Sequence, residues 1–214
     1  MSTPINHKYK WLWRENGLLD ELAEDKYGNL QPLSWYIKQL SRCAKQLAEK
    51  HPIDQAYANY FGWQGEVLCE FWLRLFGHRY DLCDIEDTSE DQFTRGFDIR
   101  ARSIFASELE AQIQVKMRGR SDAIFNEYDL FTFLDEAKEA EILPPYMVLM
   151  VPTSTGLKRD VLSYHKNFKQ SGFHRFRIIT GPVMEEEIDN LPLTEGNSGK
   201  EEFLIQFREA IFAG

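Results

Sequence analysis

The chain has 214 residues and a net charge of −9, and 43% of its residues are hydrophobic. A chain of this length buries roughly 70% of its unfolded surface, so we expect it to fold without help from disulfides or metals. No stretch approaches the run of about 18 apolar residues that a membrane span needs, and the acidic balance argues against non-specific adhesion to nucleic acid.

The cysteines and histidines do not predict a zinc site or a disulfide. Cys43, Cys69 and Cys83 form no CxxC motif, and the five histidines are scattered along the chain. The first residues also lack the apolar core and small-residue cleavage site of a signal peptide. We therefore expect free thiols and a reducing, cytoplasmic location.

Two helices are predicted in the first part of the chain, after an aromatic-rich start. Apolar residues at helical spacing predict the first helix from about Pro32 to Lys50. The second runs from an N-cap at Asp54 to about Phe76, where Gly77 ends it. We assign residues 1–53 to a helical extension that packs on a core domain formed by residues 54–214.

The rest of the chain mixes strands and helices. An acidic stretch, Asp81–Asp91, is interpreted as a loop, and a hairpin with its turn near Ser107 follows. This mixture predicts an α/β (α+β) fold around a mixed sheet. The predicted elements are strands at 97–105 and 111–117, a helix at 125–141, a buried strand at 144–152, a strand at 173–181 and an amphipathic helix at 199–212.

The second hairpin strand places polar residues on one face. Gln114 and Lys116 alternate with Ile113 and Val115, which is a period of two. A turn near Ser107 pairs Asp98 with Lys116, and a slip of two residues pairs Asp98 with Gln114. Either register puts these polar side chains together on one face. A structural ion pair is one interpretation, and an active site is the other.

A carboxylate on the preceding helix adds a third element. Glu66 lies off the apolar stripe of that helix and is preceded by Gly62 and Gly65. Glycine costs roughly 1 kcal/mol in a helix interior relative to alanine. The two glycines therefore indicate the close approach of another backbone or of a ligand, or packing between helices.

Four short motifs occur in a fixed order: "GE" at 65–66, "LFG" at 75–77, "GFDI" at 96–99 and "IQVK" at 113–116. Together they resemble the PD-(D/E)xK nuclease superfamily, with its restriction-endonuclease-like fold. The Gln-x-Lys variant is similar to Mrr-like restriction enzymes and to nuclease domains of bacterial defence systems. The resemblance spans Gly65–Pro152 and implies a mixed central sheet flanked by helices.

The resemblance implies a site for metal-dependent phosphodiester hydrolysis. Oxygen ligands suit Mg²⁺ or Mn²⁺, and such an ion acts as a Lewis acid on phosphate chemistry. Lys116 would orient a water or stabilise developing charge. The catalytic residues implied are Glu66, Asp98, Gln114 and Lys116, with Asp98, Glu66 and the backbone carbonyl of Val115 as metal ligands.

Arginines flank the motif residues in sequence. We interpret Arg95, Arg100, Arg102, Arg118 and Arg120 as candidate phosphate contacts, with a solvated strand face as the alternative. A second basic stretch, Lys158–Arg177, is another candidate surface. No motif that reads base sequence is present.

The implied function is that of a magnesium-dependent endonuclease acting on DNA. Cutting both strands of a duplex requires two sites, so a homodimer is expected, and the resemblance implies a role in anti-phage defence or a mobile element. One alternative is a catalytically inactive nuclease-fold subunit that binds nucleic acid or a protein within a larger defence complex. Another is an interaction protein whose N-terminal helices dock a partner.

Overall fold

The computed structural model describes residues 35, 56–87, 98–104, 106–117, 123–125, 146–157, 176–192, 196 and 198–212. Of the first predicted helix, only Trp35 is described; it is helical and packs against the hydrophobic core. The predicted helix at 125–141 lies outside the described residues, apart from Phe125, which is in a strand. No helix in the described part of the chain is long and apolar enough to cross a membrane.

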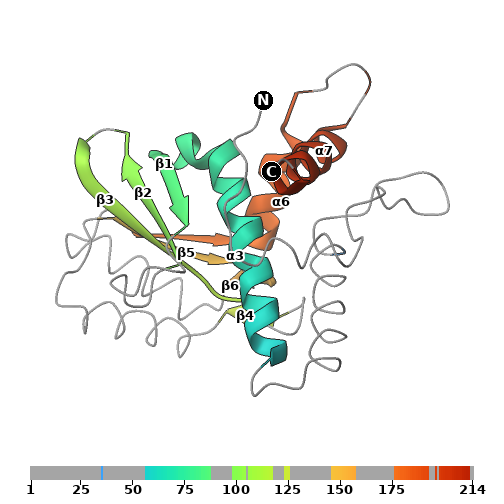
Figure 1. Cartoon of the computed structure of the whole chain (residues 1–214), viewed down its shortest axis with the longest axis horizontal. Helices are drawn as coiled ribbons and strands as arrows, with labels where there is room; N and C mark the ends of the chain where they lie inside the picture. The colour runs from blue at the N-terminus through green and yellow to red at the C-terminus, as the bar shows by residue number, and fades with distance from the viewer. Residues whose placement is uncertain are drawn as a thin grey trace.

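The described strands form a mixed sheet of five strands in the order β1-β2-β3-β5-β7, with a small β4-β6 sheet beside it (Figure 1). The first three strands are antiparallel neighbours, whereas β3, β5 and β7 run parallel. The carboxyl ends of β3, β5 and β7 therefore lie at the same end of the sheet, together with the amino end of β2. The strands are β1 (Leu82–Asp87), β2 (Ile99–Ser103), β3 (Ala106–Val115), β4 (Ala123–Phe125), β5 (Tyr146–Val151), β6 (Ser154–Leu157) and β7 (Phe176–Thr180).

The predicted strand at 144–152 is confirmed as β5, all six of whose residues are buried. This matches its continuous apolar sequence, because parallel strands at the centre of a sheet are covered on both faces. The predicted strand at 173–181 is confirmed as β7, which pairs with β5 at the edge of the sheet. The mixed α+β architecture expected from the sequence is therefore observed.

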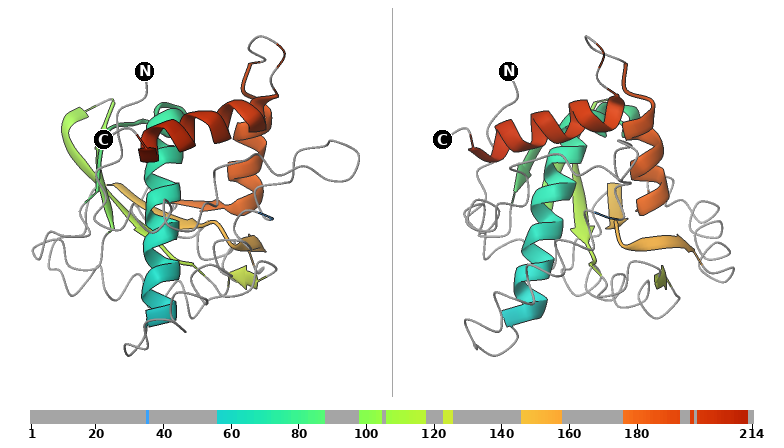
Figure 2. Two further views of the ribbon diagram at one scale, coloured as in Figure 1. Left: turned by 45° about the vertical axis from the view of Figure 1, so that its right-hand side comes forward. Right: turned by 90° about the vertical axis from the view of Figure 1, so that its right-hand side faces the viewer.

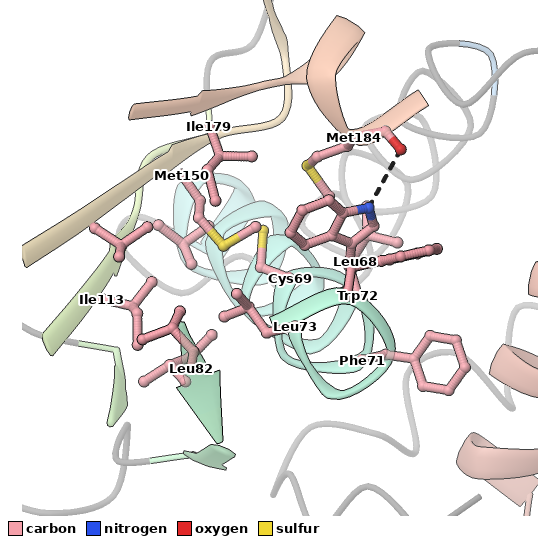
Figure 3. Packing of buried hydrophobic residues seen from close by; sticks show 14 of the residues in the cluster. Leu68, Cys69, Phe71, Trp72, Leu73, Leu82, Ile113, Met150, Ile179 and Met184 are labelled. Carbon is pink, nitrogen blue, oxygen red and sulfur yellow. Dashed lines mark hydrogen bonds between the residues drawn. The ribbon is translucent and has the colours of Figure 1, made fainter. Parts of the chain in front are cut away.

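Helix α3 (Ala56–Phe76) ends where the sequence predicts and passes between the sheet and α7 (Gly199–Phe212) (Figure 2). Cys69 and Leu73 point toward the sheet, whereas Phe71 points away from it (Figure 3). The Phe71 ring meets that of Phe203 on α7 edge to face, with centroids 5.3 Å apart. The buried surface of α3 is wider than the single apolar stripe predicted from the sequence, because the sheet packs on one side of the helix and α7 on the other.

The acidic stretch after α3 corrects one prediction. A 3-10 helix, η1 (Gly77–Tyr80), leads into β1, so Leu82–Asp87 is a strand and not part of a loop. Leu82 is buried in the core, and the pairing with β2 is interrupted by an irregularity between Cys83 and Glu86. Within it, Asp84 has a φ of +49°, a left-handed conformation that aspartate tolerates better than most residues.

The two C-terminal helices close the fold. The predicted helix at 199–212 is confirmed as α7, and the Ser198 hydroxyl caps it by accepting a 3.2 Å hydrogen bond from the Glu201 N–H. Helix α6 (Gly181–Asp189), which directly follows β7, was not predicted from the sequence. The Trp72 indole Nε1–H joins α3 to α6 by donating to the Met184 carbonyl at 3.2 Å (Figure 3).

Candidate functional site

The hairpin register is the second of the two that the sequence allowed. Ile99 pairs with Ile113 and Arg100 with Gln112, so Asp98 lies at the position opposite Gln114. The register expected from a turn at Ser107 is wrong. The chain reverses earlier, between Ser103 and Ala106, and the pairing shifts between Arg102 and Ser103. From Ile99 to Arg102, each partner on β3 therefore lies two residues earlier than expected.

The Asp98 carboxylate lies where the β2–β3 hydrogen-bond ladder ends. The Asp98 N–H donates to the Ile113 carbonyl at 3.0 Å. The next donor along β3, the Val115 N–H, bonds at 2.6 Å to Oδ2 of Asp98 in place of a backbone carbonyl. A carboxylate makes a stronger bond to an N–H than a neutral acceptor does, so this contact fixes the position of the acid.

The backbone at the end of β3 is held on both sides. The Lys116 N–H donates to the Met150 carbonyl on β5 at 2.9 Å, while the Val115 N–H points toward Asp98. A strand residue directs its N–H and its C=O toward the same neighbour. The Val115 carbonyl therefore also points to the Asp98 side, as a metal ligand at this position would.

The side chains of β3 alternate between two environments. Ile113 and Val115 are buried in the core beneath α3. Gln114 and Lys116 are directed to the opposite face; Gln114 is only 3% exposed, and Lys116 is half-buried. That the amide and the ammonium share a face stays a prediction from the alternation along β3.

Glu66 comes to this region from the α3 side of the sheet. Its predecessor, Gly65, lies against the Met117 side chain just beyond β3. One turn further along α3, the Cys69 thiol is fully buried, and its pKa is raised by burial and then by the negative charges of Asp98 and Glu66. The buried thiol therefore lies within electrostatic range of both carboxylates.

The region offers several hard oxygen donors of the kind that suits Mg²⁺ or Mn²⁺ completed by water. The Asp98 carboxylate and the Val115 backbone lie at the end of the hairpin, Glu66 comes from the α3 side of the sheet, and Gln114 is directed to the opposite face. Across the described residues, no group of three or more His, Cys, Asp or Glu side chains is arranged to hold a metal. A metal ion at this site would therefore depend on two acids and on backbone and amide oxygens.

Comparisons of the chain with protein-family models, curated proteins and solved structures find no match. The site is consequently defined by the local geometry and by the motifs that the chain carries.

The two candidate arginines that the structure describes face acids across the strands. Arg100 on β2 lies 3.9 Å from Glu86 on β1 and 3.5 Å from Glu110 on β3. Arg102 lies 3.7 Å from Asp84. For this pair, the contacts favour the solvated strand face over the phosphate-binding interpretation. The other three candidates, Arg95, Arg118 and Arg120, lie outside the described residues, as does most of Lys158–Arg177.

Two neighbours of the site were not singled out from the sequence. Cys69 follows Glu66 by three residues, so helical spacing places both on one side of α3. Met117 continues the apolar alternation of Ile113 and Val115 beyond the end of β3, which puts it on the α3 side. Both relations follow from spacing once α3 is known to cover that face of the sheet.

Proposed function

We propose that this chain is a metal-dependent nuclease of restriction-endonuclease-like fold that hydrolyses phosphodiester bonds in DNA. The proposal starts from the ordered motifs between Gly65 and Pro152, which resemble the PD-(D/E)xK superfamily. The described fold, a helix followed by three antiparallel strands and then parallel ones, is compatible with the mixed sheet that this resemblance implies.

The observation that carries the proposal is the position of Asp98. Its carboxylate is fixed at the end of the hairpin by the 2.6 Å bond from Val115. Its charge, like that of Glu66, acts on the thiol of Cys69. These two observations support a site formed by an acid from a strand end and an acid from a helix, together with Lys116 from the end of β3.

Asp98, Glu66 and the Val115 carbonyl would hold Mg²⁺ or Mn²⁺, with Gln114 as a neutral fourth donor. When bound, such an ion supplies Lewis acidity to the phosphate and lowers the pKa of water. The chain's own contribution is to fix the acids in place and to present an ammonium group, Lys116, where negative charge develops on the phosphate.

A plasmid-cleavage assay with Asp98→Asn tests the proposal. The parent chain should nick or linearise supercoiled DNA in Mg²⁺ or Mn²⁺ and should be inactive in EDTA. Asparagine keeps a side-chain oxygen that can accept the Val115 N–H but removes the charge. Asp98→Asn should therefore fold normally and lose cleavage, and the Gly62→Ala chain serves as the matched active control. A parent chain inactive on duplex, single-stranded and branched DNA in both metals would refute the proposal.

Two observations favour a second candidate, an inactive nuclease-fold subunit that binds nucleic acid or a protein partner. Gln114 replaces a charged ligand with a neutral one, and Arg100 and Arg102 face acids. This candidate predicts DNA or partner binding that persists in EDTA with no cleavage in any metal. Binding measured by fluorescence anisotropy alongside the cleavage assay distinguishes the two functions.

A further inference from the structure

Gly65 on α3 lies against the side chain of Met117, just beyond the end of β3. A Cβ atom built on it would lie 2.2 Å from Cγ and 2.5 Å from Sδ of Met117. Carbon atoms in contact are about 3.5–4.0 Å apart, so a side chain at this position requires a displacement of more than about 1 Å. Gly62, three residues earlier on the same helix, has nothing within 4 Å of the corresponding point.

The contact joins the two elements that carry the candidate site. Gly65 is followed by Glu66 on α3, and Met117 is preceded by Lys116 at the end of β3. Met117 packs against the hydrophobic core, and the Lys116 backbone is tied to β5 through Met150. The strand end is therefore anchored, and the thickness of the Met117 side chain sets how closely α3 approaches it.

We propose that Gly65 and Met117 are positioning residues whose contact sets the distance of Glu66 from Asp98 and Lys116. This inference rests on the proposed function for its consequence in catalysis. Its geometric content is separate: an added methyl at position 65 moves α3, and Glu66 with it, away from the strand. Since the nearest clashing atom is Cγ and not the far end of the methionine, bending the tip of the side chain does not relieve the clash.

The test compares three variants of the full chain with the parent by Mn²⁺ binding, measured calorimetrically without nucleic acid. Gly65→Ala should weaken Mn²⁺ binding about tenfold, as for other outer-shell changes at metal sites, and slow cleavage roughly 100-fold, as for a 1 Å misplacement. Gly62→Ala should leave both unchanged. The double variant Gly65→Ala/Met117→Ala lacks Cγ, Sδ and Cε of Met117, the three atoms nearest the added methyl. It should bind Mn²⁺ with an affinity within about threefold of the parent, because the effects of substitutions at two residues in contact are strongly coupled.

A packing role without positioning predicts a different pattern. Gly65→Ala would then lower the melting temperature while binding Mn²⁺ as tightly as Gly62→Ala does, and that result would overturn the inference. Failure of the double variant to recover affinity, although folded by circular dichroism, would also overturn it. If Gly65→Ala does not fold, Met117→Ala alone should weaken Mn²⁺ binding because the spacer is lost, and unchanged affinity in that variant contradicts the proposal.

Different results would refute the positioning role of Gly65 and Met117 and the proposed nuclease function. If the parent binds no Mn²⁺ and cleaves nothing, the nuclease proposal is lost, and crystal structures of the parent and Gly65→Ala still decide the positioning. A shift of α3 relative to β3 supports the inference. A rotated Met117 beside an unmoved helix contradicts it.

Discussion

The backbone N–H of Val115 donates a 2.6 Å hydrogen bond to Oδ2 of Asp98, at the point where β2 and β3 stop pairing through their backbones. The bond gives Asp98 a structural role, because its carboxylate satisfies a backbone donor. The same bond holds a negative charge at the end of the hairpin, and mutation can separate these two roles.

Asp98→Ala and Asp98→Asn should differ in their free energy of unfolding, but both should bind Mn²⁺ more weakly than the parent. Alanine leaves the Val115 N–H without its acceptor, which costs about 1–3 kcal/mol for a buried donor. Asparagine retains an acceptor oxygen and should cost about 1 kcal/mol or less, the difference between a charged and a neutral bond. Urea unfolding gives the free energies, and Mn²⁺ titration should show weakened binding in both. Equal unfolding free energies would mean that the bond does not matter for folding.

Lys116→Ala should leave the fold intact and lower cleavage by about 100-fold or more, as expected for loss of one electrostatic stabiliser. Folding should survive because the bond from Lys116 to Met150 uses the backbone N–H, which alanine retains. Lys116→Met, which keeps the aliphatic length without the charge, should behave like alanine. Single-turnover cleavage together with a circular dichroism spectrum checks this prediction, and a Lys116→Ala chain as fast as the parent would remove the ammonium from the mechanism.

The salt dependence of DNA binding should distinguish the paired arginines from the others. Each phosphate contact contributes about 0.9 to the slope of log affinity against log salt. Because Arg100 and Arg102 already face Glu86, Glu110 and Asp84, their replacement by glutamine should change the slope by well under this amount.

Arg118→Gln and Arg120→Gln provide the comparison for that measurement. If these residues contact phosphate, each substitution should lower the slope by about 1. Fluorescence anisotropy over a range of salt concentrations in EDTA measures binding without cleavage. A full unit lost for Arg100→Gln would instead mean that its ion pairs break when DNA binds.

Alkaline pH should destabilise the protein through Cys69. Burial and the charges of Asp98 and Glu66 raise the pKa of this thiol, whereas in the unfolded chain it titrates near its ordinary value of about 8.5. Below that pH, both states hold the proton and the thiol has no effect. Above it, only the unfolded state loses the proton, so the free energy of unfolding falls as the pH rises.

Cys69→Ala should remove this component of the pH dependence. The thiol lowers the free energy of unfolding by up to about 1.4 kcal/mol per pH unit above 8.5, and alanine cannot titrate. Urea unfolding of both chains at pH 7.5, 8.5 and 9.5 tests this, since the gap between them should change only in the upper part of the range. A constant gap would show that the thiol ionises as readily in the native state as in the unfolded chain.

The sequence predicts the elements whose signals are local. Strong apolar periodicity fixes α3 and α7, and an unbroken apolar run marks β5. β1 was missed because its acidic residues are typical of a loop, and their partners Arg100 and Arg102 on β2 are recognised only once the strand pairing is known. The hairpin register was left with two answers, since the shift beside Arg102 that decides it depends on turn geometry.

For the candidate site, alternation along β3 predicts that Gln114 and Lys116 share a face. It gives no information about the approach of α3, because the distance between a helix and a strand end is a property of packing. The glycine beside Glu66 was a visible signal of close packing, but among the described residues it lies against the Met117 side chain and not against another backbone or a second helix. Gly62 shows that the same residue type three positions away carries no such contact.

All four candidate side chains fall between residues 66 and 116, a stretch that forms α3 and the three antiparallel strands through contacts close in sequence. Such contacts form quickly, whereas the parallel pairing of β5 and β7 closes longer loops and is slower. During synthesis the candidate groups would thus gather early, and the Lys116 backbone would be secured only once β5 has left the ribosome. Under the proposed function, cleavage of DNA would begin only after β5 has joined the sheet.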